Sequence, residues 1–254
     1  MKFSANLGFL WKEKSLPEQI RAAAKAGFDA VECHFPYDTP WQDTKAAINE
    51  TGMEMVGLNT LRDPEGTGAF GLSAILGKEK EARKNIDQAV EYAANIGCKN
   101  IHVMAGLASG EEACKTFVSQ LSYATGKAAA HDITILIEPI NPKDGPGYFM
   151  NSIDLAASIV EEISADNLKI MFDCYHISLI HGNVVGLYKK HEPMIGHVQI
   201  AAAPDRTEPD HGDVDYPIVL GKLEALGYNG FFGAEYAPRG TTEEGLGWLA
   251  DMRK

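Results

Sequence analysis

Short apolar runs alternate with amphipathic helical patterns along the whole chain, and this alternation constrains the fold more than any other feature. Strand patterns are predicted at residues 3–7, 30–33, 53–58, 101–104, 134–137, 168–172, 195–198 and 231–234. Helical patterns are predicted at residues 16–26, 41–50, 78–96, 111–130, 153–163, 184–190, 216–226 and 242–252. Eight such pairs in 254 residues give about 32 residues per strand–helix unit.

This alternation fits either a doubly wound open sheet or a (β/α)8 barrel. The count of eight favours the barrel. The strand-to-helix turns also lack G-x-G-x-x-G and G-x-x-x-x-G-K-[ST], the phosphate-binding signatures that are common in open sheets. Because no linker or composition break divides the chain, we predict one α/β domain over residues 1–254, a (β/α)8 TIM barrel.

The charge balance argues against a polyanionic partner. The chain has 23 basic and 35 acidic residues, a formal net charge of −12, and no Lys/Arg cluster that would offset the repulsion of phosphate. Four scattered cysteines without a C-x-x-C pair are typical of a reducing compartment. No signal peptide or run of ~20 apolar residues is apparent. We expect a soluble, cytoplasmic protein with no nucleic-acid or membrane partner. A homo-oligomer is compatible with the sequence.

Four of the predicted strands end in an oxygen-bearing side chain. The four residues are Glu138, Asp173, Gln199 and Glu235, and they stand 35, 26 and 36 positions apart. A strand buried on both faces has no reason to end in a polar group unless that group points into a site. Because a barrel gathers the carboxyl ends of its strands around one centre, we predict that the four side chains converge. For any one carboxylate alone, a helix N-cap or a loop salt bridge explains the position equally well.

The four residues offer three carboxylates and one amide carbonyl. Such hard oxygen donors suit Mg²⁺ or Mn²⁺ better than Zn²⁺. A divalent ion at this place can bind two adjacent oxygens of a hydroxy-carbonyl substrate and stabilise an enediolate. Glu138 and Glu235, on the fifth and eighth strands, can pass a proton between adjacent carbons if one accepts while the other donates.

Two further side chains are predicted to bind the substrate. His176, three residues after Asp173, can hydrogen-bond a substrate oxygen or a metal-bound water, although a histidine at a helix start also serves as a cap or a packing residue. Arg206 follows the seventh strand, and its planar guanidinium suits a substrate carboxylate. An ion pair between Arg206 and Asp205 or Glu208 is the competing interpretation.

Other polar side chains also lie near strand ends, but none is specific alone. They are Asn6, Glu32 and Asn59 on the first three strands, and His197, two residues before Gln199. We interpret His197 as a buried histidine, with a supporting role behind the site as the alternative.

Several segments resemble the hydroxypyruvate isomerase family, within the xylose isomerase-like barrels. They are FSANL, AGFDAVE, FPYD, LIEPIN with Glu138, D-x-Y-H from Asp173 to His176, GHVQIA with Gln199, R-x-E-P-x-x-G from Arg206, and G-x-E-Y around Glu235. The resemblance covers nearly the whole chain, and EPIN together with GHVQIA is its most specific part. It implies an isomerase that interconverts hydroxypyruvate and tartronate semialdehyde. In that case the two glutamates are the proton donor and acceptor, and the four strand-end residues form the metal shell.

Four alternatives stay open at this point. A 2-oxo-tetronate isomerase shares the barrel, and so does a ketose 3-epimerase, although epimerases usually have histidine where Gln199 stands. Asp210 and His211 occupy loop positions where similar isomerases are expected to have small residues. We predict that both border the substrate mouth, so the exact substrate stays open. An abasic-site DNA endonuclease would need several zinc ions and many histidine ligands. A sugar-acid sensor would not need the pair Glu138 and Glu235.

Overall fold

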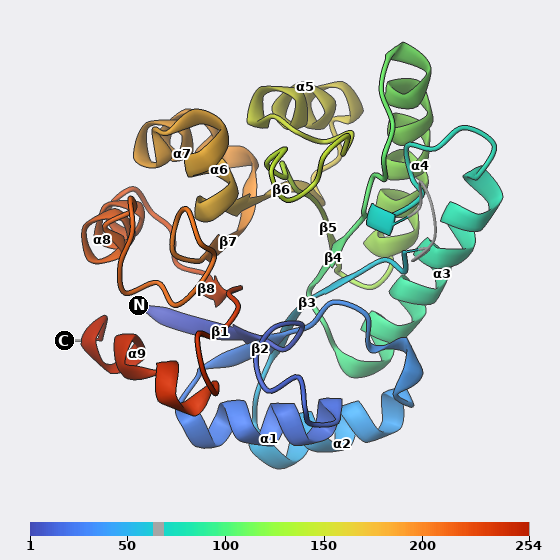
Figure 1. The fold of residues 1–254 in the computed structure, drawn as a ribbon. Coiled ribbons are helices and arrows are strands. Elements are labelled where there is room, and N and C mark those ends of the chain that lie inside the picture. The colour runs from blue at the N-terminus through green and yellow to red at the C-terminus, as the bar shows by residue number, and fades with distance from the viewer. Residues whose placement is uncertain (63–68, 254) are drawn as a thin grey trace.

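A closed barrel of eight parallel strands forms the centre of the protein, with the strands paired in chain order from β1 round to β8 and back to β1 (Figure 1). The computed structural model describes residues 1–62 and 69–253. The strands are β1 (Lys2–Asn6), β2 (Ala30–Glu32), β3 (Met55–Asn59), β4 (Asn100–His102), β5 (Thr134–Ile137), β6 (Leu168–Asp173), β7 (Ile195–Ile200) and β8 (Phe231–Ala234). The predicted TIM barrel is therefore confirmed.

Helices surround the barrel and connect successive strands, as Figure 1 shows. They are α1 (Leu16–Ala26), α2 (Trp41–Thr51), α3 (Glu79–Ile96), α4 (Glu111–Ala129), α5 (Ile153–Ile163), α6 (Cys174–His181), α7 (Val184–His191), α8 (Tyr216–Ala225) and α9 (Gly247–Asp251). Short 3-10 turns are η1 (Pro36–Asp38), η3 (Glu192–Met194) and η4 (Glu243–Gly245). Within the described residues, none of these helices is long and apolar enough to cross a membrane.

Local sequence signals place most helix ends correctly. Gly27 and Gly97 end α1 and α3 in the left-handed region, with φ of 88° and 81°. Glycine pays no Cβ penalty there, so it stops a helix at low cost. Ser152 begins α5, and its side chain accepts a hydrogen bond from the backbone N–H of Asp154 at 3.3 Å.

Two helical regions differ from the prediction. Helix α6 begins at Cys174, directly after β6. A helix start was expected near His176, but the range of this helix was not predicted, because CYHISLIH has too little polar alternation to mark a helix face. The predicted helix at residues 242–252 is divided into η4 and the five-residue α9, since Gly245 and Gly247 weaken a continuous helix at this point. In the glycine-rich loop predicted at residues 62–77, residues 63–68 lie outside the described residues.

The strand register sets up the site at one end of the barrel. Asp173 of β6 lies beside Gln199 of β7, and Gln199 lies beside Gly233 of β8. On the opposite side of β8, β1 pairs Ser4 with Gly233. Polar residues from these neighbouring strands are thereby brought to a common level, above apolar strand residues such as Ile135 that are fully buried.

Candidate active site

The four oxygen-bearing strand ends come together at the carboxyl end of the barrel. Glu138, Asp173, Gln199 and Glu235 are all buried, with 5%, 1%, 3% and 6% of their surface exposed. Glu138 and Glu235 line a cavity of about 270 Å³ together with His176 and Arg206. Gln199 lines a small adjoining cavity of about 10 Å³, which shares His102 with the larger one.

Three of these side chains form a group that can hold a metal ion. Candidate ligand atoms of Glu138, Asp173 and His176 lie within 4.8 Å of one another. His176 Nε2 is 3.7 Å from Glu138 Oε1 and 3.7 Å from Asp173 Oδ2. The structure therefore groups His176 with the candidate ligands, where the sequence placed it beside the substrate.

Unpaired buried oxygens supply an independent test of the metal prediction. Each of the four predicted ligands has one buried side-chain oxygen without a hydrogen-bond partner: Glu138 Oε1, Asp173 Oδ2, Gln199 Oε1 and Glu235 Oε2. Leaving such a group unpaired costs about 1–3 kcal/mol, and more if it is charged. A divalent cation would satisfy the oxygens that it binds. Glu138 and Asp173 belong to the group whose ligand atoms lie within 4.8 Å of one another and so fit a hard metal ion, whereas Glu235 is not part of that group.

The carboxylates also repel one another. Burial, reinforced by Glu235 and Asp173, raises the pKa of Glu138 well above its usual value. Burial and then Glu235 raise the pKa of Asp173 to about 7. The pKa of His176 falls well below its ordinary value because of burial, with Arg206 contributing. Arg206 partly offsets this repulsion by lowering the pKa of both Glu138 and Asp173, and a divalent cation would supply further positive charge.

Asp173 combines two roles that the sequence presented as alternatives. Its Oδ1 accepts a hydrogen bond from the backbone N–H of Tyr175 at 2.8 Å and so caps α6. Its Oδ2 faces His176 and stays free for a ligand. Because Asp173 is both the last residue of β6 and the N-cap of α6, its carboxylate is held in the cluster.

Arg206 reaches into the cavity from the loop after β7. Its Nη2 lies 3.6 Å from Glu235 Oε2 and 4.0 Å from Asp173 Oδ2. Its guanidinium lies 5.0 Å from the ring centre of Phe9 and 5.2 Å from that of Tyr175. Arg206 itself adopts a left-handed φ of 57°, which turns the loop at this residue.

The competing interpretation of Arg206 is not supported by the structure. Arg206 Nη1 is 3.3 Å from Asp144 Oδ2, in the loop after β5. Glu208 instead binds Arg239, with Arg239 Nε 2.7 Å from Glu208 Oε2, and Asp205 lies 2.9 Å from His211. Asp205 and Glu208 therefore bind other residues and not Arg206, which lines the cavity.

Sequence reasoning missed several polar residues of this site, among them His34, His102 and Asn141. His34 Nε2 lies 2.9 Å from Glu235 Oε1, and His102 Nδ1 lies 3.5 Å from Glu138 Oε2. Burial lowers the pKa of His102 to about 3, which keeps its ring neutral. Asn141 Nδ2 is 2.6 Å from His176 Nδ1. The strand-end rule applied to β2 and β4 would have found the two histidines, because His34 follows β2 and His102 ends β4.

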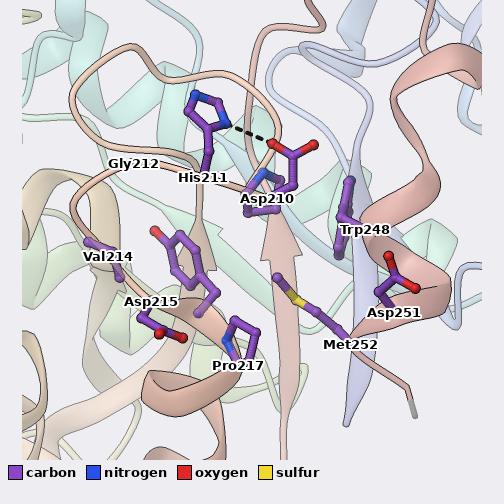
Figure 2. Close-up of a pocket in the computed structure, with 11 residues that line it drawn as sticks. Asp210, His211, Gly212, Val214, Asp215, Pro217, Trp248, Asp251 and Met252 are labelled. Carbon is purple, nitrogen blue, oxygen red and sulfur yellow. Dashed lines mark hydrogen bonds and ion pairs between the residues drawn. The ribbon is translucent and has the colours of Figure 1, made fainter.

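The predicted place of Asp210 and His211 needs correction. Both line a separate cavity of about 380 Å³ beside α9, where Figure 2 shows them with Trp248 and Met252. Neither is among the residues that line the candidate site. Their own ion pairs hold them in the loop: Arg239 Nη2 lies 2.7 Å from Asp210 Oδ2, and His211 Nδ1 lies 2.7 Å from Asp210 Oδ1.

The fold and site define a (β/α)8 barrel enzyme whose polar cluster lies where such barrels carry their active sites. Residues 20–252 match the family described as xylose isomerase-like TIM barrel. The protein belongs to this family, and the family resemblance predicted from its sequence is confirmed.

Relatives of similar length give this family assignment more detail. A Cupriavidus necator protein named 2-oxo-tetronate isomerase is 42% identical, over 98% of this chain and 97% of that protein. A Homo sapiens protein named “Putative hydroxypyruvate isomerase” is 40% identical, over 98% of this chain and 94% of that protein. The named relatives agree on isomerase chemistry and differ in substrate.

Solved structures agree with the barrel. A Brucella melitensis protein named AP endonuclease, family 2, superposes with a TM-score of 0.92 at 38% identity, covering 98% of both chains. A D-psicose 3-epimerase from Clostridium cellulolyticum H10 superposes with a TM-score of 0.80, over 97% of this chain and 89% of that chain. Its identity is 18%, so this second likeness concerns the fold alone.

Proposed function

We propose that the protein is an intramolecular oxidoreductase that interconverts hydroxypyruvate and tartronate semialdehyde at a divalent-metal site. The observation that carries this proposal is one cavity lined by two glutamates from different strands, in a cluster that leaves four buried oxygens unpaired. A 2-oxo-tetronate isomerase is the second candidate, because a relative with that name is 42% identical over nearly the whole chain. The four cysteines are all free thiols, which supports a cytoplasmic location.

Glu138, Asp173, Gln199 and Glu235 would hold Mg²⁺ or Mn²⁺, with His176 as an additional candidate ligand. The oxygen-rich donor set favours these hard cations. When bound, the cation would hold two adjacent substrate oxygens and stabilise the negative charge that develops on them.

The two glutamates would move the proton between the adjacent carbons of the substrate. One removes a proton from C3 of hydroxypyruvate and the other returns a proton to C2, while the proton of the C3 hydroxyl passes to the oxygen on C2. Because the reaction is reversible, each glutamate is the base in one direction and the acid in the other. His34, 2.9 Å from Glu235, and His102, 3.5 Å from Glu138, would hold these carboxylates in place.

Arg206 would bind the substrate carboxylate, and Phe9 would form an apolar wall of the cavity. A small anion approaching a protein of net charge −12 needs such a local positive charge.

The site also disfavours an abasic-site endonuclease. Among the described residues, the candidate metal group consists of Glu138, Asp173 and His176. It contains a single histidine, whereas a site for several zinc ions would need many histidine ligands.

A panel of substrates tests this proposal. We expect turnover of hydroxypyruvate or of the four-carbon 2-oxo-tetronate, with free ketohexoses and abasic-site DNA unreactive under the same conditions. The ratio of kcat/KM between the two acids decides between the two candidate substrates. Turnover confined to ketohexoses, or cleavage of abasic-site DNA, would contradict the proposed function.

Metal binding should stabilise the folded protein. Mn²⁺ at about 100 times its Kd is expected to add about 2.7 kcal/mol to the free energy of unfolding, because it binds only the folded state. Thermal unfolding with and without Mn²⁺ measures this gain. In Asp173→Asn the gain should fall markedly, whereas the exposed control Asp154→Asn should keep it. Equal gains in both variants would place the metal elsewhere.

A further inference from the structure

A further buried carboxylate, Glu32, lies next to the site and has no part in the proton transfer described above. Glu32, the last residue of β2, has 3% of its surface exposed. Its two oxygens contact four polar side chains of β1 and β7. The contacts are His197 Nε2 at 2.6 Å, Gln199 Nε2 at 2.9 Å, Asn6 Nδ2 at 3.0 Å and Ser4 Oγ at 3.3 Å.

The contact with Gln199 determines which end of its amide is free. A carboxylate accepts hydrogen bonds and does not donate them, so Glu32 can pair with the NH₂ group of Gln199 but not with its carbonyl. The amide nitrogen is accordingly on Glu32, and Oε1 of Gln199 is buried without a partner. A flipped amide would bring two acceptors together inside the barrel and lose a charge-assisted hydrogen bond.

The space for this arrangement comes from Gly233 on β8, which lies beside Gln199 in the strand register. A Cβ atom at Gly233 would lie 2.6 Å and 2.7 Å from the two oxygens of Glu32, and 2.9 Å from Cγ of Gln199. Such distances are too short, so any larger residue at this position must displace Glu32, Gln199 or both. Gly57, on the other side of Glu32, differs: its Cβ would lie 4.0 Å from Glu32 Cβ, an ordinary contact.

We propose that Glu32 is a positioning residue that presents the carbonyl oxygen of Gln199 to the divalent cation, and that Gly233 provides the room for this pair. The inference rests on the proposed function, because it takes Gln199 as a cation ligand. It assigns a role to His197 as well, which together with Asn6 and Ser4 holds Glu32 in a fixed place.

The direct test is a double-mutant cycle on Mn²⁺ affinity, measured by isothermal titration calorimetry on the full chain. Glu32→Gln is expected to weaken Mn²⁺ binding about 10- to 100-fold, the range usual for partners that orient a ligand. Gln199→Met removes the carbonyl ligand and should weaken binding at least as much. If Glu32 acts through Gln199, the double variant binds Mn²⁺ no more weakly than Gln199→Met alone.

Different outcomes contradict different parts of the account. An unchanged Mn²⁺ affinity in Glu32→Gln, or losses that simply multiply in the double variant, would overturn the positioning role. If Glu138→Gln weakens Mn²⁺ binding while Gln199→Met does not, the metal site stands and the inference about Glu32 fails. If the wild-type protein binds no Mn²⁺, the proposed function itself fails.

A pair of glycine substitutions tests the same idea without removing a buried charge. Gly233→Ala is expected to weaken Mn²⁺ binding about 10-fold or more, because its Cβ displaces the Glu32–Gln199 pair. Gly57→Ala is the matched control. Gly57 lies on β3, next to the strand that carries Glu32, and this variant should bind Mn²⁺ like the wild type. Circular dichroism confirms that both variants fold. Equal Mn²⁺ affinities in the two variants would overturn the inference.

Discussion

Replacing Glu138 with glutamine is expected to lower kcat about 10³-fold, and the same change at Glu235 should have an effect of similar size. Glutamine keeps the shape and one oxygen of the side chain but can neither accept nor release a proton as a carboxylate does. Each variant therefore loses one half of the proton transfer and keeps a folded barrel. Steady-state kinetics with hydroxypyruvate and with 2-oxo-tetronate measures the loss.

The matched control for this prediction is Glu161→Gln, an exposed carboxylate on α5. It makes the same chemical change outside the cavity, and we expect kcat to stay at the wild-type value. Exchange of substrate hydrogen with D₂O gives a second measurement. A variant that keeps its proton-removing glutamate should still exchange C3 hydrogen while failing to form product. If both single glutamate variants retain kcat within about tenfold, the assigned acid–base pair is wrong.

Replacing Arg206 with alanine is expected to raise KM about 100-fold, with a smaller change in kcat. The guanidinium lies 5.0 Å from the ring centre of Phe9 and 5.2 Å from that of Tyr175, and Arg206 lines the cavity. Two charge-assisted hydrogen bonds to a carboxylate contribute about 1.5–3 kcal/mol each, part of which water restores in the variant. Arg206→Lys keeps the charge but loses the fork, so its KM should lie between those of wild type and alanine.

A neutral substrate analogue separates carboxylate binding from a general disturbance of the site. Dihydroxyacetone carries the hydroxy-ketone group without the carboxylate, and its weak binding should change little in Arg206→Ala. An unchanged KM for hydroxypyruvate would exclude Arg206 as the carboxylate-binding residue. An equal rise in KM for both compounds would instead indicate that Arg206 supports the site through its contacts with Asp173 and Glu235.

The fold and the convergence of the strand ends were predictable because both follow from local patterns. A strand buried on both faces is a short apolar run, and its terminal polar residue is visible in the sequence itself. Asp173 shows this well, because the same residue ends β6 and caps the N-terminus of α6. Parallel strands in a closed barrel then bring such residues together without further information.

Contacts between loops were not predictable in the same way. The partner of Arg206 is Asp144, which lies 62 positions away in another loop, whereas Asp205 and Glu208 are close in sequence but bound elsewhere. Asp210 likewise turns towards Arg239 and away from the candidate site. Which loop charges meet depends on tertiary geometry, and sequence proximity is a poor guide to it.

Metal-dependent turnover of hydroxypyruvate tests the central claim most directly. The protein is treated with EDTA, dialysed, and assayed for tartronate semialdehyde before and after addition of Mg²⁺ or Mn²⁺. We predict that turnover is lost in the metal-free protein and restored by the added cation, and that Glu138→Gln is not rescued in this way. Full turnover by the metal-free protein, or none of hydroxypyruvate and 2-oxo-tetronate by the reloaded protein, would contradict the account.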